Sequence, residues 1–580
     1  MRMTILRFAN SLVEGPVFLK SLWYCIRQSS LPVSGVPAAD NRPTRVAQLN
    51  VALNPLHSKV MPVVPPHDAK TQCSTAVTSI IHACLRNATM TKKRQPFEIH
   101  AAYRRLDWLV VCLIALYCGD AIDLQAAELL VGTASTSITP DEPVALSGQF
   151  HTRVAKTVES PVTANVVALE SRDGDDSLDL AIMVSCDLVV IREDIQSRIR
   201  SRVAADLPGV DVQKLFVNAT HTHTAPVMVE GKYVIPKEGV IQPAEYVEFL
   251  IQRVADAVVT AWQTRKPAGV SWGLGHAVVA HNRRAMYADG SAAMYGSTNK
   301  PEFRGIEGYE DHGVDVLSFW DADKKPIALA VDVACPSQEV EGRRAVNADF
   351  WHQVRILLRN RYSQDLGVLG WCGAAGDQSP HLMFNQAAEA RMLKLRGLTR
   401  LEEIARRIDV AVEEANTAAQ NDIRTDVPLV HLVRTLKLPI WMVTDQQYMA
   451  AKAEVDRLAK DPANHRKMQW QKKVVDRYEQ QKEGDLYERQ FHVIRLGDVA
   501  ICTNPFELYT DYGIQIKARS KAVQTFVIQL TGEHSGTYLP TARAVQGGGY
   551  SAIAPSCPVG PEGGQALVDQ TVAAINSLWE

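Results

Sequence analysis

From residue 129 onward, short apolar or β-branched runs alternate with longer runs that have a helical period. Strands are predicted at VGTASTSITP, VTANVVALES and LDLAIMVSCDLVVI, and an amphipathic helix at REDIQSRIRSRVAADL. A further strand, KLFVNATHTHTAP, precedes the helical run EYVEFLIQRVADAVVTAWQT. This alternation predicts a β/α arrangement for the first half of the domain.

The same alternation continues towards the C-terminus. VSWGLGHAVV predicts a strand, and VDVLSFWDADKKPIALAVDVAC predicts two strands joined by a turn at DADKKP. FWHQVRILLRN then predicts a helix, and LGVLGWCGAAGD a buried strand. We expect a long helix over 401–420, a charged helical stretch on the surface over 445–488, and strands with a helix between them at FHVIRLGDVAICTNPFELYTDYG and TFVIQLTGEH. Because no internal repeat of roughly 20 to 50 residues is visible, we expect one large α/β domain of mixed α+β class over residues 128–580.

One strongly apolar run, Trp108–Cys118, lies before this domain and follows a cluster of basic residues. Its eleven residues are too few to span a bilayer, which takes about 20, but they match the apolar region of a secretory signal peptide. Gly119 and Ala121 place small residues where a signal peptidase reads them, so we expect cleavage between about 121 and 127. The signal-like segment at 104–127 therefore predicts a secreted or periplasmic protein.

Signal peptides begin at a chain start, so Met90 is the expected initiator and residues 90–127 the signal peptide region. Residues 1–89 are then an upstream or disordered extension, because they show neither a sustained period nor a catalytic pattern. The alternative is a buried strand or helix behind a genuine N-terminal extension. N-terminal sequencing of the native protein decides between the two.

Charge and cysteine content narrow the function further. The 62 Lys and Arg residues against 64 Asp and Glu give a net charge of −2, which argues against holding nucleic acid or an anionic membrane through bulk charge. No transmembrane anchor is expected in the mature chain. Its cysteines form no CxxC metal pattern and allow at most two disulfides; they are Cys186, Cys335, Cys372, Cys502 and Cys557.

Two histidines, His221 and His223, stand at the expected end of a strand, where alternate residues point to the same face. Such a pair suits a zinc site, although two hydrogen-bonded loop histidines fit the same pattern. Ligand sites of αβ folds gather at the ends of strands. The pair is therefore a candidate metal site.

Two further segments place a polar side chain after an apolar run. In GDQSP, Ser379 lies on a turn that leaves a buried strand, and the ordinary role of Asp377 is to bind backbone amides of that turn. In NPFEL, Glu507 follows an apolar strand, and its ordinary role is to cap the next helix. Neither segment by itself identifies a catalytic group.

Taken in order, these segments resemble the neutral/alkaline (non-lysosomal) ceramidase family. The resemblance rests on VGTASTSITP, NATHTHTAP, HNRR at 281–284, ACPSQ to NADF, GDQSP, NPFELYT, GTYLPT and GGGY, and it covers roughly residues 129–555. It implies a ceramidase-type catalytic domain that hydrolyses the N-acyl bond of ceramide or a related lipid to fatty acid and sphingoid base. Its implied cofactor is one Zn²⁺ ion.

The resemblance also implies how the zinc ion is held. In the family, two histidines, a glutamate and a tyrosine bind the metal, and His221, Glu507 and Tyr538 occupy three of these places. The remaining histidine lies fourteen residues before an aspartate in the family, and the corresponding residue before Asp349 is Cys335. A thiolate can bind zinc at about 2.3 Å, but it makes the metal a weaker Lewis acid and its bound water less acidic. An ordinary buried thiol is the alternative role of this cysteine.

Four further residues correspond to groups that act on the substrate. His223 and Arg283 match family residues that contact the amide or its developing oxyanion, and Tyr550 lies twelve residues after Tyr538, as the second catalytic tyrosine does in the family. Ser379 matches a serine assigned as nucleophile or as the partner of a substrate hydroxyl. The sequence ends about thirty residues after Tyr550, so we expect no C-terminal immunoglobulin-like domain.

The expected function is thus zinc-dependent hydrolysis of a lipid or small-molecule amide. Because a fold does not determine a substrate, hydrolysis of another amide or an ester on the same scaffold is an alternative. A catalytically silent descendant that binds a lipid or glycan is another. Zinc content discriminates between the enzyme and the binding protein.

Overall fold

The computed structural model describes residues 127–192 and 194–580. All of them belong to one compact unit, Asp120–Glu580. The expected initiator methionine, the upstream extension and nearly all of the signal-like segment lie outside the described residues, so these expectations stay predictions. No helix in the described part is long and apolar enough to cross a membrane.

Three sheets enclose one apolar core, to which each contributes large side chains such as Phe216, Leu317 and Phe526. Each sheet contains one parallel pair of strands, and its other neighbouring strands are antiparallel. In spatial order, the first sheet contains β6 (Leu215–Ala219), β5 (Asp176–Cys186), β4 (Thr163–Asp173), β1 (Glu128–Ser137) and β7 (Lys266–Pro267). The second sheet contains β15 (Gly367–Cys372), β14 (Pro326–Val333), β13 (Gly313–Trp320) and β8 (Gly269–His276). The third sheet contains β17 (Leu429–Pro439), β18 (Leu486–Leu496), β19 (Val499–Thr503) and β21 (Gln524–Ile528).

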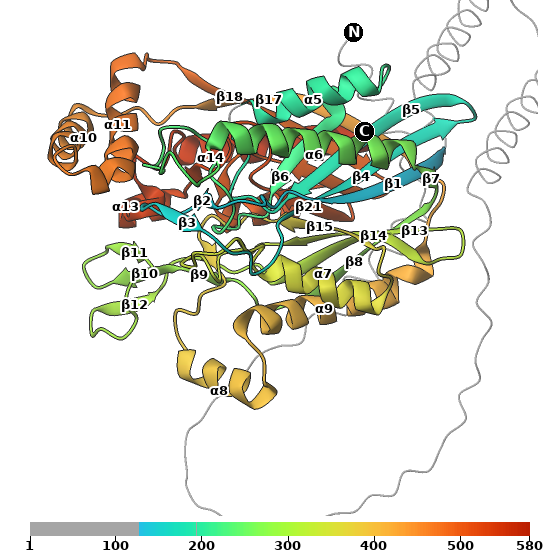
Figure 1. Cartoon of the computed structure of the whole chain (residues 1–580), viewed down its shortest axis with the longest axis horizontal. Coiled ribbons are helices and arrows are strands. Elements are labelled where there is room, and N and C mark those ends of the chain that lie inside the picture. The colour runs from blue at the N-terminus through green and yellow to red at the C-terminus, as the bar shows by residue number, and fades with distance from the viewer. Residues whose placement is uncertain (1–126, 193) are drawn as a thin grey trace, which may run out of the picture. The chain divides into compact units, whose positions relative to one another are not determined.

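A pair of helices covers the outer face of each sheet (Figure 1). The helices begin where their sequences allow it: Pro243 occupies the first helical position of α6, and Thr399 with Glu402 forms a capping box at the start of α9. The six helices are α5 (Ile195–Asp206) and α6 (Pro243–Gln263) on the first sheet, α7 (Phe350–Arg361) and α9 (Arg400–Ala419) on the second, and α12 (Thr510–Arg519) and α14 (Pro561–Asn576) on the third.

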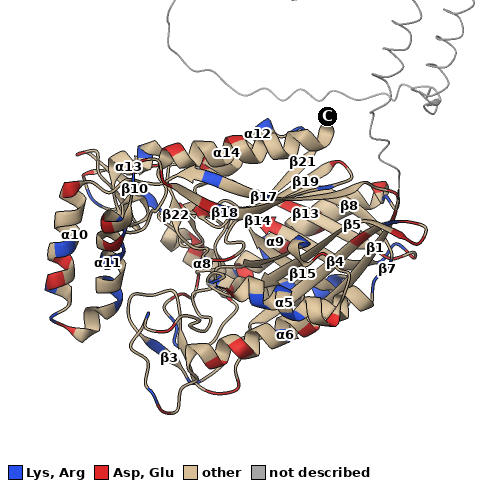
Figure 2. Ribbon diagram, turned by 90° about the horizontal axis from the view of Figure 1, so that it is seen from above, with Lys and Arg blue, Asp and Glu red and all other residues tan. Residues whose placement is uncertain are grey.

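Smaller elements surround one end of these layers. The helices α10 and α11 form a hairpin that stands apart at the left of Figure 1 and carries both basic and acidic residues in Figure 2. The smaller elements are α8 (Gln386–Arg396), α10 (Asp445–Leu458), α11 (His465–Gln480), α13 (Ala542–Gly547), β2 (Val144–Leu146), β3 (Arg153–Ala155), β9 (His281–Asn282), β10 (Arg284–Tyr287), β11 (Ala292–Met294), β12 (Phe303–Ile306), β16 (Gln378–Ser379), β20 (Glu507–Leu508) and β22 (Tyr538–Leu539).

The mixed α+β class expected from the sequence is confirmed, and the predicted strand pair is the β13–β14 hairpin. Helix α14 was not predicted, since glycines at 563 and 564 weaken its helical pattern. The structure explains Gly564, because a Cβ there would lie 2.3 Å from the ring of Tyr512. Helix α8 has no buried residue and therefore no apolar stripe to predict it.

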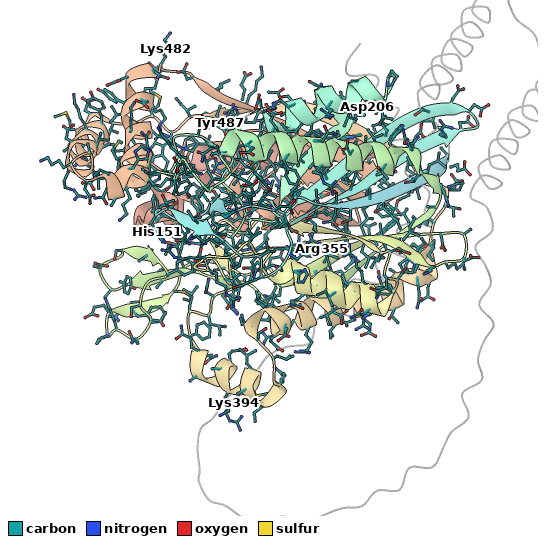
Figure 3. All side chains as sticks on the ribbon, in the orientation of Figure 1. His151, Asp206, Arg355, Lys394, Lys482 and Tyr487 are labelled. Carbon is teal, nitrogen blue, oxygen red and sulfur yellow. The ribbon has the colours of Figure 1, made fainter. Side chains whose placement is uncertain are left out.

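Buried charge also lies between the layers. Figure 3 shows side chains filling the interior, where Arg355 of α7 contacts Asp187 through both of its terminal nitrogens, at 2.7 and 3.0 Å. The five cysteines in the described part are all buried and unbridged. Burial raises the pKa of each thiol above its ordinary value, so these cysteines are protonated at neutral pH.

A buried pair of histidines in the third sheet makes the stability of the fold depend on pH. Nε2 of His431 lies 2.9 Å from Nδ1 of His492, and both side chains are almost fully buried. Burial, together with the charges of Lys214 and Arg200, outweighs the hydrogen bond to the Leu180 carbonyl and lowers the pKa of His431 to about 3. An unfolded histidine titrates near about 6.5. Below that pH the unfolded chain binds more protons, so this stabilisation is complete above pH 6.5 and is lost as the pH falls towards 3.

We expect the free energy of unfolding to fall by about 2 kcal/mol between pH 7 and pH 5 through His431 alone. Urea titrations at both pH values measure the loss. In the His431→Gln variant the difference between the two pH values should shrink by that amount, since the variant has no proton to bind at this position. An equal pH dependence in the variant and the parent would contradict the prediction.

Candidate active site

The carboxyl ends of the parallel strands meet at one cavity. In each sheet a helix connects the two parallel strands, giving β5–α5–β6, β14–α7–β15 and β19–α12–β21. Segments that follow these strands contribute His221, Gln338, Glu507 and Tyr538 to the wall of a cavity of about 290 Å³. Ligand sites of αβ folds lie at this end of the strands, so the topology brings together residues that are far apart in the sequence.

His221 lies beyond the strand on which it was expected. Strand β6 ends at Ala219, and His221 adopts a left-handed backbone conformation with φ of +71°. The alternation rule for strands therefore does not explain why His221 and His223 face the same cavity, and that part of the interpretation was wrong. Their rings nevertheless lie 4.9 Å apart, edge to face. A strained non-glycine residue held in place by its surroundings is typical of functional sites.

Hydrogen bonding orients the His221 ring towards Glu507. Its Nδ1 lies 2.5 Å from the Val189 carbonyl oxygen, which can only accept a proton, so Nδ1 is the donor. Its Nε2 then points at Oε2 of Glu507, 3.2 Å away. A backbone carbonyl that holds the second nitrogen of a histidine in this way is the usual support of a metal-binding histidine.

The carboxylate of Glu507 is held in its charged form. Burial raises its pKa, but His221, Arg283 and a hydrogen bond from Tyr538 outweigh burial and lower the pKa to about 2. Tyr538 is the direct neighbour of Glu507 in the β20–β22 pair, which sets their side chains beside each other.

The ligand atoms that converge beside Glu507 are of the types that bind zinc. One imidazole nitrogen, one carboxylate oxygen and one phenol oxygen converge from His221, Glu507 and Tyr538, and catalytic zinc sites commonly use three protein ligands with a further position open. In the described part of the chain, no three His, Cys, Asp or Glu side chains cluster as a metal site would require. The tyrosine is therefore essential to the set.

Cys335 does not line the cavity. It is fully buried in the core between the second sheet and α7, and its sulfur lies 3.7 Å from the carbonyl oxygens of Val279 and Pro336. Burial raises its pKa well above the ordinary value, so the thiol is protonated. This geometry favours the ordinary buried thiol over the zinc ligand, while the ligand set itself stays a prediction.

Arg283 connects several groups of the cavity. Its Nη1 donates to Oε1 of Gln338 at 2.9 Å and to the Tyr295 hydroxyl at 3.2 Å. Its Nη2 donates to the Gly376 carbonyl at 3.0 Å and to the Tyr538 hydroxyl at 3.2 Å, and lies 3.9 Å from Glu507. The guanidinium is nearly inaccessible to solvent. It is therefore a fixed positive charge that orders its neighbours.

The orientation of His223 follows from this network. Because Oε1 of Gln338 accepts from Arg283, the amide nitrogen of Gln338 faces Nε2 of His223, 2.9 Å away, and donates to it. The ring proton is then on Nδ1, which lies 3.0 Å from Oε2 of Glu341. Burial lowers the pKa of His223, against the opposing effect of Glu341. A neutral histidine oriented by a carboxylate is the arrangement of a general base. Sequence reasoning missed Gln338 and Glu341, although the former ends the ACPSQ motif.

Ser379 and Tyr550 occupy different positions. Ser379 is fully buried, and its hydroxyl lies 3.0 Å from that of Tyr295, which separates it from the cavity. Tyr550 lines the cavity, its ring packs on Tyr538, and its hydroxyl forms no hydrogen bond within the described chain. The structure thus brings together His221, His223, Arg283, Glu507, Tyr538 and Tyr550, while Ser379 lies behind Tyr295 and Cys335 lies in the core.

One buried arginine holds the loops of the cavity together. Arg153 of β3 donates to the carbonyl oxygens of Ser147 at 2.5 Å, His223 at 2.6 Å and Glu341 at 2.5 Å. Beside it, Gly148 has φ of +103°, and a Cβ there would lie 2.5 Å from Cγ of His223. No sequence motif indicated either residue, because their role depends on contacts between distant loops.

We expect Gly148→Ala to lower kcat/KM by about a hundredfold, because a shift of about 1 Å in a catalytic group costs that much. Gly209→Ala is the matched control: φ at Gly209 is +99°, and nothing lies within 4 Å of a Cβ there. The backbone strain is similar in the two variants, so the additional loss of activity and of unfolding temperature in Gly148→Ala measures the contact with His223. If the Gly209→Ala variant lost as much activity as Gly148→Ala, contact with His223 would not be the cause.

Comparison with known proteins supports the fold. No protein-family model matches the sequence, and no curated protein matches it. Similar solved structures include neutral ceramidase from Pseudomonas aeruginosa, with 15% identity and a TM-score of 0.56 over 78% of this chain and 75% of that chain. A ceramidase complexed with C2 has 14% identity and a TM-score of 0.55 over 78% of this chain and 76% of that chain. The ceramidase fold that the sequence motifs implied is therefore confirmed: this chain has a neutral ceramidase-like fold.

Proposed function

We propose that this protein is a zinc-dependent amidohydrolase that cleaves an N-acyl bond to a fatty acid and an amine. The observation that carries the proposal is the convergence of His221, Glu507 and Tyr538 beside the His223–Glu341 pair in one cavity. The solved structures of similar fold are named ceramidases, which supports an amide as the bond that is cleaved.

The zinc ion would be held by His221, Glu507 and Tyr538, and its chemistry is to polarise the amide carbonyl and to favour ionisation of water. The position of the Cys335 thiol in the core supports a set of three protein ligands over the four that the sequence motifs imply. Such a set leaves a position open to substrate.

The protein's own residues carry out the proton transfers and stabilise the oxyanion. His223 accepts a proton from the attacking water at Nε2, after that water has displaced the Gln338 amide, and Glu341 stabilises the resulting imidazolium through Nδ1. The same proton then goes to the nitrogen of the leaving amine as the C–N bond breaks. The Tyr550 hydroxyl, which is open to the cavity, donates to the developing oxyanion. The Ser379 hydroxyl is buried behind Tyr295, which favours water over this serine as the nucleophile.

The test is release of octanoate from N-octanoylsphingosine and from N-octanoylethanolamine by the full chain. We expect hydrolysis of at least one amide, a loss of at least about tenfold after metal removal by a chelator, and recovery on addition of zinc. Metal analysis of the same samples should give one zinc per active chain. Hydrolysis that persists unchanged in protein shown to be metal-free would overturn the proposal.

A further inference from the structure

The cavity opens onto a second pocket whose wall is rich in positive charge. This pocket, of about 380 Å³, shares Glu507, Tyr538 and Tyr550 with the first. Four basic side chains line it: Arg192, Lys232, Arg466 and Lys473. They come from three separate segments, namely the residues after β5, the connection between β6 and α6, and helix α11.

The hairpin of α10 and α11 forms one wall of this pocket and is not exposed to solvent on all sides. Nε2 of His465, at the start of α11, lies 2.7 Å from the Gly231 carbonyl oxygen, which ties the helix to the segment that carries Lys232. Trp470 of α11 packs against Tyr550 and Phe150, with ring centroids 5.4 and 5.6 Å apart. The expectation that residues 445–488 lie only on the surface is therefore incomplete.

Arg466 has no acceptor in the described part of the chain. Its guanidinium forms no hydrogen bond or ion pair there, and its Nε is buried. It lies instead over the faces of Phe150 and Tyr233, with centroid distances of 5.4 and 5.9 Å. A guanidinium presents five N–H donors in a planar fork that suits a carboxylate or a phosphate.

Lys232 repeats this pattern. Its Nζ lies 5.8 Å over the Tyr233 ring and forms no ion pair within the described residues. Burial and the charges of Arg192, Arg466 and Lys473 lower its pKa well below the ordinary value, against the weaker opposing effect of Glu507. The positive groups thus repel one another, which an anion in the pocket would relieve.

The acidic groups of the two pockets do not supply that anion. Glu507 faces His221, Glu341 faces His223, and Asp476 pairs with Lys472 on its own helix. Among the described residues this leaves Glu230, at the exposed rim, against Lys232, Arg466 and Lys473. The pocket therefore has a surplus of positive charge next to the proposed reaction centre.

We propose that the amide cleaved by this site carries an oxyanion, a carboxylate or a phosphate, near its scissile bond, and that Arg466 and Lys232 bind it. The proposal rests on the function proposed above and narrows its substrate class. An anionic head group suits this pocket better than the uncharged head group of ceramide, because uncharged hydroxyls would leave the guanidinium of Arg466 without a counter-charge. Trp470 adds an aromatic ring to the wall of this pocket, and Phe150 and Tyr233 line the adjoining cavity.

Three amides with the same acyl chain test the proposal: N-octanoylglycine, N-octanoylethanolamine phosphate and the uncharged N-octanoylethanolamine. We expect kcat/KM of the intact protein to be at least about tenfold higher for one anionic amide than for the uncharged one. The preferred anion distinguishes carboxylate from phosphate. An uncharged amide that is cleaved faster than both anionic ones would overturn the proposal.

Substitutions of single side chains test which residues bind the anionic group. Arg466→Gln should lower kcat/KM for the preferred anionic amide by about 10- to 100-fold, mainly through KM, and leave the uncharged amide within about threefold. Lys232→Gln should act in the same direction. Lys467→Gln, an exposed residue of α11 that does not line the pocket, is the matched control and should change none of the three. An equal loss for all three amides in Arg466→Gln would mean a structural role and would overturn the proposal.

Binding separates this proposal from the failure of the proposed function. If none of the three amides is hydrolysed, calorimetry with N-octanoylglycine and with inorganic phosphate still tests the anion site. Binding that is lost in Arg466→Gln and kept in Lys467→Gln would retain the anion site and reject the amidohydrolase. No binding of either probe to the intact protein would reject the anion site.

Discussion

Replacing Glu507 with glutamine is expected to lower kcat/KM by at least about a thousandfold while the chain stays folded. The substitution keeps the size of the side chain and removes the negative charge that faces His221, at 3.2 Å, and Arg283, at 3.9 Å. Both the proposed zinc ion and the balance of charge at the reaction centre depend on that carboxylate. Turnover of the best amide and zinc content per chain are the two measurements, and both should fall together.

Stability should change less than activity in this variant. Arg283 keeps its bonds to Gln338 and to the Gly376 carbonyl, so we expect a loss of about 1–3 kcal/mol in the free energy of unfolding. Glu488→Gln is the matched control, since Glu488 is an exposed residue of β18 paired with Lys437, and its turnover should stay within about twofold. Retention of more than a tenth of the parent activity by Glu507→Gln would contradict the role assigned to the carboxylate.

The second large effect is expected from Arg283→Lys, which keeps the charge and loses the planar fork. A single ammonium cannot reach Gln338, Tyr295 and Tyr538 together as the two terminal nitrogens of arginine do. The amide of Gln338 would then turn freely, and His223 would lose its fixed orientation. We expect kcat to fall by about 100- to 1,000-fold with a smaller change in KM, because positioning is lost and binding surface is kept.

A second buried arginine controls for stability in this experiment. Arg200 of α5 donates to the Leu215 carbonyl at the opposite end of β6 from His221. Arg200→Lys should lower the unfolding temperature to a similar degree and leave kcat within about threefold, since the cavity is untouched. If both variants lost activity in parallel with their unfolding temperatures, the effect at Arg283 would be one of folding.

Local patterns in the sequence were sufficient for most of the regular structure. Strands β1, β4, β5 and β6 and strands β13 to β15 coincide with apolar runs that are visible from neighbouring residues along the chain. The same is true of α6 and α9, with their apolar faces and their start signals. Helix α8 escaped prediction because none of its residues is buried, and α14 because its glycines serve packing against Tyr512.

Motifs identified part of the site for a related reason. The segments around His221, Glu507 and Tyr538 are short and local, and each of these side chains lines the cavity. The pairing of Glu507 with Tyr538 depends on the β20–β22 register, which joins segments on either side of α12 and β21. A motif identifies the residues, but only the register of the two strands places their side chains next to each other.

The sequence by itself determined the order of strands and helices, the mixed α+β class and the main candidate ligands, because period and motif are properties of neighbouring residues. Tertiary structure alone decided that Cys335 lies in the core, that Ser379 lies behind Tyr295, and that Arg466 faces a pocket. Along the chain, α11 has the charge pattern of an ordinary solvated helix. Arg466 faces the pocket because the helix packs against the segment around residue 231, and contacts between segments so far apart leave no periodic signal in either of them.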